Sequence, residues 1–425
     1  MAGAENLRAS KRIGVIGAGA VGLCCALHLR QRGHDVDLID YRNPGEGASL
    51  GNAGIIATSE VFPVARPGTL RQVPRMLLDP IGPLVIRPSY APKIAPWLAR
   101  FLLASRPAQV DRLSRALAGL LAPAGDAWRE VAKLCHADSR LEMTGWLRLQ
   151  ATPAQMRRAQ SDAEAQRRLG VRSEVLSVDE ARELEPALSR NFAGAAYFPD
   201  AGKITSPLGM MRAIAAHLRS AGVEFWKGRA QRIEASPAEA VVVDEAGKRS
   251  VYDQVVIAAG AWSRRLVQSL GADVCLDTER GYHVMLPTPE KTVKRAVSVP
   301  VPGYSLVQME DGLRVTTGIE FAGLDAPADF RRIRRILREV GKILPGVAPQ
   351  PRSEWLGFRP SMPQSLPVIG PLENARTVFL AFGHGHLGLT LAPVTGRVAA
   401  QMIDGETPSV DMTPFLPARH VWPRS

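Results

Sequence analysis

The feature that most constrains the fold is a glycine run near the N-terminus, GAGAVG at residues 17–22. Residues 12–16 before it, RIGVI, predict a short buried strand, and residues 21–31 after it predict a helix. Residues 34–40 then predict a second strand, as in the opening of a βαβ unit. This context matters, because a glycine motif alone is a weak signal. The order of strand, glycine turn, helix and strand predicts a dinucleotide-binding site.

The three glycines have separate tasks in such a turn. Gly17 permits the tight turn, Gly19 lets the backbone approach a pyrophosphate, and Gly22 lets the helix pack closely on the strand. The first helical residues, Ala20 and Val21, then offer unpaired N–H groups and the positive end of the helix dipole to the phosphates. The alternative is a glycine turn that has only a structural role.

An acidic residue stands where a ribose would bind. Asp40 ends the second predicted strand, about 20 residues after the glycine turn, where a carboxylate accepts hydrogen bonds from ribose hydroxyls. The same charge repels a 2′-phosphate, which disfavours NADP. We expect Tyr41 and Arg42 to extend the cofactor contact. The N-terminal unit by itself does not distinguish FAD from NAD.

Three further loops favour FAD over NAD. A second glycine-rich stretch occupies residues 47–54, the apolar strand VVIAAG ends at residue 260, and a glycine-histidine loop covers residues 383–390. Three loops at strand ends, far apart in sequence, suit one long ligand that crosses the sheet. The cofactor contacts expected in these loops are Ala48, Ser49, Asn52, Ala53, Gly54, Ala259, Gly260, Trp262, Gly383, His384, Gly385, Gly388 and Thr390.

Longer segments extend this prediction to the whole chain, which resembles the D-amino acid oxidase-like family of flavoproteins, and within it the D-amino acid dehydrogenase branch. The resemblance covers about residues 11–415, and within the branch it is strongest to the bacterial glyphosate oxidoreductases. The segments that carry it are PGEGASLGNAG (44–54), LLDPIGPLVIR (77–87), PWLARFLLASRP (96–107), LDTERGYHV (276–284), GFRPSMPQSLPVIG (357–370) and FGHGHLGLT (382–390).

The resemblance implies an α/β fold with two domains. A Rossmann-like FAD-binding domain would be built from residues 11–58, 203–270 and 355–410. A substrate domain with a mixed antiparallel sheet and helices would be built from residues 59–202 and 271–354.

The implied activity is oxidation of the C–N bond of a D-amino acid, a cyclic imino acid or an N-substituted glycine such as glyphosate. Hydride passes to flavin N5, water hydrolyses the imine, and a quinone or another acceptor takes the electrons. An oxidase that releases hydrogen peroxide, a noncatalytic flavin subunit of an amine dehydrogenase complex, and an NAD dehydrogenase are the alternatives.

Arg359 matches the family arginine that clamps the substrate carboxylate, and a salt bridge is its structural alternative. Tyr304 matches a strand position where relatives carry a pocket tyrosine, and a packed core tyrosine is equally compatible. Tyr282 and His283 are strand neighbours, so at most one of them lines the pocket, and we expect His283. His386 takes the place of a second carboxylate-binding arginine that some relatives carry.

Composition narrows the partners and the compartment. The formal net charge is +12, but the arginines are scattered and no nucleic-acid motif occurs, so a small anionic substrate is favoured over nucleic acid. The four cysteines are dispersed, and His384 and His386 lack acidic or cysteine partners, so we expect noncovalent FAD and no metal. A cytoplasmic protein is expected. The amphipathic segment at residues 95–107 predicts a core-facing helix, with peripheral contact to the membrane as the alternative, and oligomer formation is left open.

Overall fold

The computed structural model describes residues 10–70, 73–79, 81–288 and 292–424. It begins with the expected unit, since β1 (Arg12–Ile16), α1 (Ala20–Gln31) and β2 (Asp35–Asp40) follow one another. These strands belong to a six-stranded sheet in the order β10-β2-β1-β14-β23-β22. The neighbours from β10 to β23 are parallel, and β22 runs antiparallel to β23. The other four strands are β10 (Glu224–Lys227), β14 (Gln254–Ile257), β22 (Val368–Leu372) and β23 (Ala375–Phe382).

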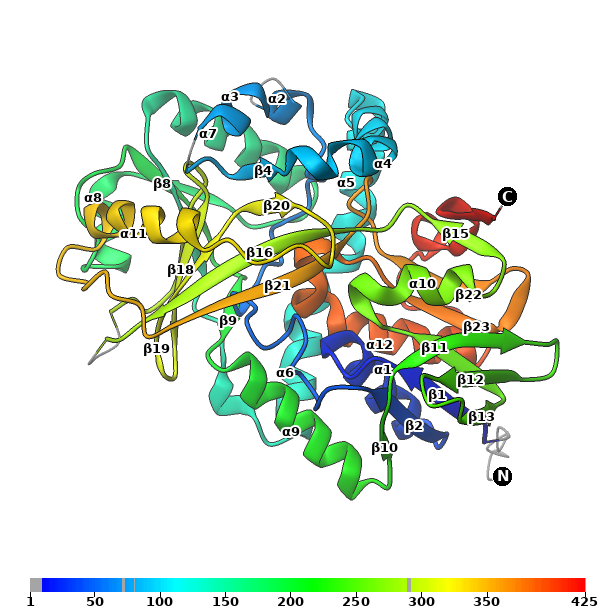
Figure 1. The fold of residues 1–425 in the computed structure, drawn as a ribbon. Coiled ribbons are helices and arrows are strands. Elements are labelled where there is room, and N and C mark those ends of the chain that lie inside the picture. Colours follow the sequence, from blue (N-terminus) through cyan, green and yellow to red (C-terminus); the bar gives the residue numbers. More distant parts are fainter. Residues whose placement is uncertain (1–9, 71–72, 80, 289–291, 425) are drawn as a thin grey trace.

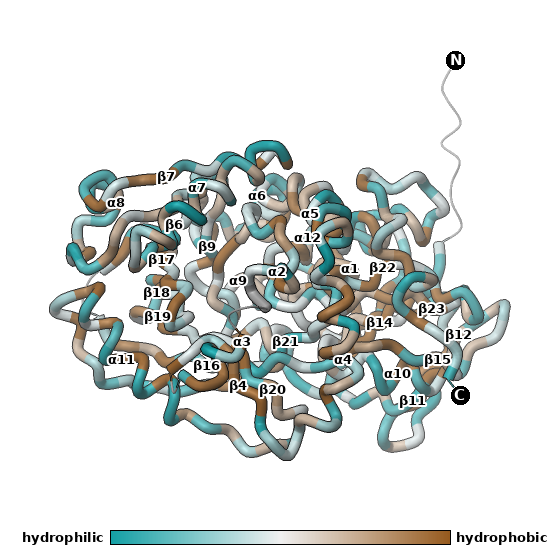
Figure 2. Tube along the Cα trace, turned by 90° about the horizontal axis from the view of Figure 1, so that it is seen from above, coloured by the Kyte–Doolittle hydropathy of each residue, from teal (hydrophilic) through white to brown (hydrophobic). Residues whose placement is uncertain are grey.

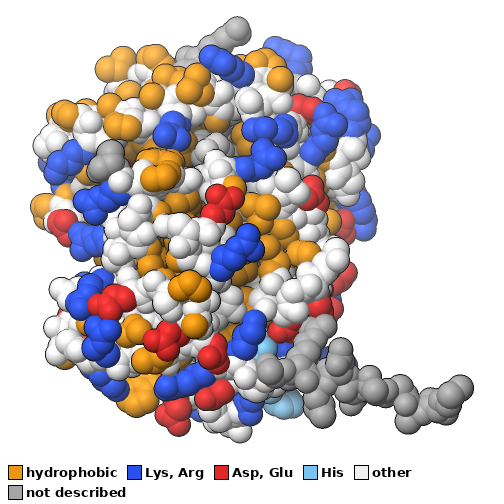
Figure 3. Space-filling view, turned by 90° about the vertical axis from the view of Figure 1, so that its right-hand side faces the viewer, with side chains coloured by type: hydrophobic (Ala, Val, Ile, Leu, Met, Phe, Trp, Pro, Cys, Tyr) orange, Lys and Arg blue, Asp and Glu red, His pale blue; other side chains and the backbone are white. Residues whose placement is uncertain are grey.

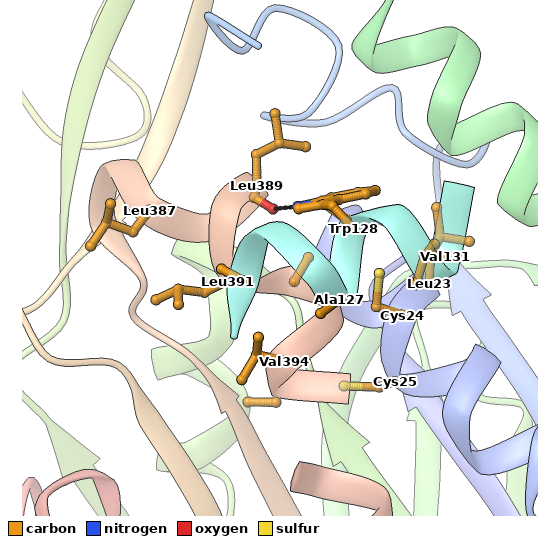
Figure 4. Close-up of a cluster of buried hydrophobic side chains, with 14 of the residues drawn as sticks. Leu23, Cys24, Cys25, Ala127, Trp128, Val131, Leu387, Leu389, Leu391 and Val394 are labelled. Carbon is orange, nitrogen blue, oxygen red and sulfur yellow. Dashed lines mark hydrogen bonds between the residues drawn. The ribbon is translucent and has the colours of Figure 1, made fainter. Parts of the chain in front are cut away.

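Three helices pack together beside this sheet: α1, α12 (Gly388–Ile403) and α6 (Ala124–Leu134). Gly396 allows the close contact between α12 and α1, because an added Cβ would lie 2.3 Å from the carbonyl oxygen of Cys24. Trp128 of α6 is fully buried, and its indole N–H donates a hydrogen bond of 2.9 Å to the carbonyl of Leu389 (Figure 4). These contacts hold the start of α12 beside the glycine turn of α1.

The second sheet has ten strands and forms the other side of the molecule (Figure 1). Its order is β4-β20-β16-β19-β18-β17-β6-β8-β7, and β21 pairs separately with β16. Helix α11 (Arg331–Ile343) covers one face and buries Ile333, Ile336 and Val340 in the core. The strands are β4 (Leu84–Ile86), β6 (Trp146–Gln150), β7 (Glu174–Leu176), β8 (Gly194–Phe198), β16 (Asp277–Leu286), β17 (Ala296–Val299), β18 (Tyr304–Met309), β19 (Gly312–Thr317), β20 (Ile319–Phe321) and β21 (Ser353–Ser361).

The two longest strands of this sheet, β16 and β21, lie side by side and run from the second sheet toward the centre of the molecule (Figure 1). Their antiparallel register pairs Asp277 with Ser361, Glu279 with Arg359 and Gly281 with Gly357. Strand β21 crosses residue 355, the boundary expected between the two domains. The strand pair therefore joins the two halves of the fold.

Smaller elements complete the structure. Three short sheets contain β11 (Ala230–Ala235), β12 (Ala240–Asp244) and β13 (Arg249–Tyr252); β15 (Ala272–Val274) and β24 (Val421–Pro423); and β3 (Ile55–Ile56), β9 (Gly202–Ile204) and β5 (Leu141–Glu142). The remaining helices are α2 (Pro67–Leu70), α3 (Val73–Leu78), α4 (Ala91–Ala104), α5 (Pro107–Leu121), α7 (Pro153–Arg168), α8 (Val178–Leu184), α9 (Pro207–Ser220) and α10 (Ser263–Gln268).

Hydrophobic residues are concentrated in the interior elements, whereas α11 alternates between hydrophobic and hydrophilic residues along its length (Figure 2). On the face shown in Figure 3, Lys and Arg side chains are interspersed with Asp and Glu. The net positive charge is therefore not gathered into one stripe on this face. Within the described ranges, no helix is both long enough and apolar enough to span a bilayer.

Candidate active site

One cavity of about 680 Å³ joins the two sheets. It begins at the carboxyl ends of the parallel strands β1, β2 and β14, where Ile16, Asp40 and Ala258 line it. It continues to β16 and β21, where Glu279 and Arg359 line it. Ligands of open parallel sheets bind at the carboxyl ends of the strands, so this cavity is the candidate active site.

The glycine turn is shaped to receive phosphates. Gly17 has a φ of +110°, and an added Cβ would lie 2.4 Å from the carbonyl oxygen of Ala258. Gly19 begins α1 without a side-chain cap, and its nearest neighbour, Ser49 Oγ, lies 3.6 Å from an added Cβ. The hydroxyl of Ser49 accepts the amide of Ala20 at 3.0 Å and fixes the second glycine loop against this turn. Gly19 itself supplies no side-chain cap, so the following amides of the first helical turn can be capped by an anion.

The ribose position holds a carboxylate in a fixed orientation. Asp40 accepts hydrogen bonds from the amide of Ala18 at 2.7 Å and from the amide of Arg42 at 2.9 Å. The guanidinium of Arg42 stacks on the Tyr41 ring, and that of Arg229 lies over the same ring at 4.1 Å. All four side chains line the cavity. A flat, positively charged wall of this kind matches the adenosine end of a dinucleotide.

Two side chains of the second sheet hold the loop at residues 47–54 in place. Arg314 donates a hydrogen bond of 2.6 Å to the carbonyl of Asn52. The Nδ1 atom of His283 lies 2.9 Å from the carbonyl oxygen of Gly51, and the His283 ring stacks on Trp355. Burial lowers the pKa of His283 to about 3, so the ring is neutral.

His283 does not line the cavity, because the loop at residues 47–54 covers its ring, and this corrects the expectation of a pocket histidine. Tyr282 borders the cavity, but its ring packs against Phe330 in the core beneath α11. Hydropathy could not indicate that the loop covers the His283 ring.

The C-terminal loop brings His384, Gly385, His386 and Gly388 to the cavity. His384 Nε2 lies 3.0 Å from Thr395 Oγ1, and burial lowers the pKa of His384 to about 3. His386 lies 3.9 Å from Glu60, and burial, followed by the nearby Arg359 and Arg148, lowers its pKa to about 4. The His384 ring is therefore neutral near pH 7.

Arg359 lies at the far end of the cavity, on β21. Its Nη1 donates to the carbonyl of Gly318 at 3.2 Å, and its Nη2 donates to that of Thr317 at 3.5 Å. Burial lowers the pKa of the guanidinium from its ordinary value, while the charge of Glu279 counteracts this. Among the described residues, no carboxylate forms a hydrogen bond with it. A guanidinium held by carbonyls and facing a cavity can bind the carboxylate of a ligand.

Three acidic residues of the cavity were missed by sequence reasoning: Glu60, Glu245 and Glu279. Glu279 is 3% exposed and accepts a 2.6 Å hydrogen bond from the hydroxyl of Ser361. Glu60 forms an ion pair with Arg148, whose guanidinium also lies over the Trp146 ring. The alternation rule was the signal for Glu279, because it places Glu279 on the same face of the strand as Gly281 and His283. Glu60 follows an irregular segment, and nothing in the sequence pointed to it.

Tyr304 lies outside the cavity. Its side chain is 3% exposed within the core beneath α11, and its hydroxyl donates to the carbonyl of Glu339 at 3.3 Å. This corrects the expectation of a pocket tyrosine, because the ring points to the face of the sheet that α11 covers.

Four other residues expected to contact the cofactor lie beside the cavity without lining it. Gly22 packs so tightly that an added Cβ would lie 1.7 Å from the carbonyl oxygen of Gly17. Gly54 and Gly383 have φ values of +75° and +85°, which their turns require. The hydroxyl of Thr390 accepts the amide of Ala57 at 3.1 Å and donates to the carbonyl of Ile55 at 3.3 Å. These residues shape the walls of the site.

The remaining expected cofactor contacts all line the cavity. They are Gly17, Gly19, Ala20, Val21, Asp40, Tyr41, Arg42, Ala48, Ser49, Asn52, Ala53, Ala259, Gly260, Trp262, His384, Gly385 and Gly388.

The donors and the shape of this site fit FAD. A helix N-terminus whose N-cap residue is a glycine, a carboxylate at the ribose position and a continuous cavity toward β21 match the diphosphate, the ribose and the flavin in turn. None of the four cysteines lines the cavity, so no thiol there is placed for a covalent flavin link. Over the described ranges, no group of three or more His, Cys, Asp or Glu side chains is arranged to hold a metal ion.

Comparison with known proteins agrees with this geometry. The model of the family described as FAD dependent oxidoreductase matches residues 12–402. A D-amino-acid oxidase of Bradyrhizobium diazoefficiens is 36% identical over 96% of this chain and 99% of its own length. A D-amino acid dehydrogenase 2 of Ralstonia nicotianae is 31% identical over 96% of this chain and 100% of its own length.

Solved structures share the fold at lower identity. Glycine oxidase from Geobacillus kaustophilus superposes with a TM-score of 0.75 at 22% identity, covering 97% of this chain and 100% of the other. Iminodiacetate oxidase from Chelativorans sp. superposes with a TM-score of 0.73 at 20% identity, covering 96% and 99% of the two chains. The expected similarity to glyphosate oxidoreductases stays a prediction.

Proposed function

Because the chain belongs to the family of FAD-dependent oxidoreductases, we propose that it oxidises the C–N bond of an amino acid whose carboxylate is held by Arg359. The protein is an FAD-dependent enzyme of the group that acts on amino acids or amines. The particular substrate and the role of Arg359 belong to the proposal.

The observation that carries the proposal is the position of Arg359. The guanidinium lines the same cavity as the nucleotide loops and is held by the carbonyls of Thr317 and Gly318. Such a group binds a carboxylate bidentately and fixes the carbon next to it in one orientation.

The surrounding residues orient the reactants and exclude water. FAD, when bound, supplies the two-electron acceptor. His384, Gly385, His386 and Gly388 line the cavity, and their backbone amide groups can stabilise negative charge there. Trp146 and Trp355 line the same region with large apolar surfaces. These walls make the charged contacts to a small zwitterion stronger than they would be in water.

D-amino acids are the proposed substrate class, and cyclic imino acids and N-substituted glycines such as glyphosate are to be tested with them. The names of the 36% and 31% identical relatives support D-amino acids. A quinone or another carrier is the proposed electron acceptor, and oxygen is the second candidate because the more similar of these two relatives is called an oxidase. Release of peroxide in air, matched to substrate consumed, separates the two.

The deciding test is anaerobic reduction of the flavin. The purified protein is mixed with D- and L-amino acids, prolines, sarcosine and glyphosate, and bleaching of the flavin absorbance is recorded. We expect reduction by at least one amino acid. The Arg359→Lys and Arg359→Ala variants should retain FAD but need at least tenfold more substrate, since a charge-assisted bidentate contact is lost. A flavin that no member of the panel bleaches would support the noncatalytic subunit instead.

A further inference from the structure

We propose that Glu279 binds the amino group of the substrate and takes its proton, while Arg359 holds the carboxylate. This inference rests on the proposed function and assigns a residue to the other end of the same zwitterion. Both residues line the cavity, and they are register partners in β16 and β21. Register partners lie on the same face of an antiparallel sheet.

From these paired positions, the side chains of Glu279 and Arg359 extend in opposite directions along the strands. The Arg359 guanidinium lies over Gly281, where an added Cβ would be 2.3 Å from Nη2. The Glu279 carboxylate turns the other way along the strands and accepts its hydrogen bond from Ser361. In the described ranges, no hydrogen bond or salt bridge joins Glu279 to Arg359. A cation and an anion held apart on one cavity wall match the two charges of an amino acid.

Within the described part of the chain, Glu279 has one hydrogen-bond partner, Ser361, and Arg359 acts on it only through its charge. The hydrogen bond to Ser361 involves one oxygen, Oε1, and a carboxylate can accept several hydrogen bonds. By contrast, the nearby Glu320 is paired with Arg87 and Tyr282, and Glu60 is paired with Arg148. A carboxylate at 3% exposure is costly without a cation in direct contact, and a substrate ammonium supplies one.

The proposed step balances in protons and electrons. One N–H bond of the substrate ammonium breaks, and its proton passes to the Glu279 carboxylate. The neutral amine lone pair then forms the C=N bond as the C–H bond breaks, and its hydrogen leaves with two electrons to FAD, which is the oxidant. The products are the iminium of the substrate, a protonated Glu279 and the two-electron-reduced cofactor.

The charges around Glu279 are consistent with a proton acceptor. Burial raises its pKa above the ordinary value for glutamate, and the like charge of Asp277 on the same strand adds to this. The hydrogen bond from Ser361 and the charge of Arg359, both on β21, act in the opposite direction. His384, whose backbone bridges to Ser361, is neutral near pH 7. A raised carboxylate pKa lies nearer that of an amine, which favours proton transfer.

The test compares wild type with Glu279→Gln and Glu279→Asp in the FAD-bound protein. The rate of anaerobic flavin reduction is measured from pH 5 to 10 with the best amino acid of the panel. We expect Glu279→Gln, which keeps an acceptor for Ser361, to lower the rate at pH 7 by about 100-fold. The loss should shrink as pH approaches the amine pKa, where free amine is available. Glu279→Asp should recover part of the rate.

Two controls separate this inference from its alternatives. Propionate, a carboxylate without an amine, should perturb the flavin spectrum of Glu279→Gln at the same concentration as in wild type, whereas Arg359→Lys should need more. Glu60→Gln changes another acidic residue of the cavity, one that is already paired with Arg148, and should keep the wild-type dependence of the rate on pH. If Glu279→Gln is reduced like wild type at every pH, or if Glu60→Gln alone alters that dependence, the assignment of Glu279 is wrong. Failure of wild type to be reduced would instead overturn the proposed function.

Discussion

The Nδ1 atom of His283 lies 2.9 Å from the carbonyl oxygen of Gly51, so a histidine of the second sheet holds a loop of the nucleotide site. His283→Ala removes this hydrogen bond, worth about 1 kcal/mol, and should weaken FAD binding about fivefold. A fluorescence titration of the apoprotein with FAD measures the change. His283→Asn keeps an N–H donor and serves as the matched variant. A His283→Ala protein with wild-type FAD affinity and a raised KM would instead indicate that His283 belongs to the substrate pocket.

Two glycines of the same turn should respond differently to alanine. An added Cβ at Gly19 would meet only Ser49 Oγ, at an ordinary contact distance of 3.6 Å, so Gly19→Ala should leave the melting temperature of the apoprotein within about 2 °C of wild type. The added methyl group nevertheless occupies the place of the pyrophosphate, and FAD should no longer co-purify. Gly22→Ala would place Cβ 1.7 Å from a carbonyl oxygen and should destabilise the apoprotein itself. Equal melting temperatures for the two variants would contradict this division of roles.

The free energy of unfolding should decrease as the pH is lowered, because two histidines are buried in the neutral form. Burial lowers the pKa of His283 and His384 to about 3 from an ordinary value of 6.5. Between these values the unfolded chain binds protons that the folded protein does not, so the free energy of unfolding falls as pH falls below about 6.5. Each histidine contributes at most about 1.4 kcal/mol per pH unit. Urea unfolding of wild type and His384→Gln from pH 7 to 4.5 should show a smaller slope for the variant.

Trp128 links α6 to the start of α12, next to the C-terminal loop of the site. Trp128→Phe keeps most of the buried ring but leaves the carbonyl of Leu389 without its donor. The loss of a buried hydrogen bond and of ring volume should lower the free energy of unfolding by about 1–3 kcal/mol. Urea denaturation of the apoprotein measures this change in the free energy of unfolding. An unchanged midpoint of the urea transition would show that water replaces the indole N–H.

Local patterns predicted the core of the nucleotide half. The glycine turn, α1, β2 and β14 lie where the sequence pattern placed them, within a few residues. These elements have clear local signals, because buried parallel strands are uniformly apolar and helices end at glycine. The short strand β4 was not predicted, because only its pairing with β20 makes it a strand.

The substrate half was harder to predict, because its side chains are positioned by contacts distant in sequence. Arg359 came from a motif, whereas Glu279 acquires its place only when β21 pairs with β16. Tyr304 and His283 could not be placed from the sequence, since a tyrosine or histidine on a strand can face either a cavity or a covering element. In this chain α11 covers Tyr304, and the loop at residues 47–54 covers His283.

The six-stranded sheet has a consequence for the order in which the chain is made. Its central strand β1 is synthesised first, but its neighbours β14 and β23 come from the middle and the end of the sequence. The cavity is closed on one side by residues 384–389, so no complete cofactor site exists until that segment has left the ribosome. During most of translation the early glycine turn is therefore exposed without its partners. FAD capture is a late event of biosynthesis, and premature termination before β23 yields a chain that cannot retain the cofactor.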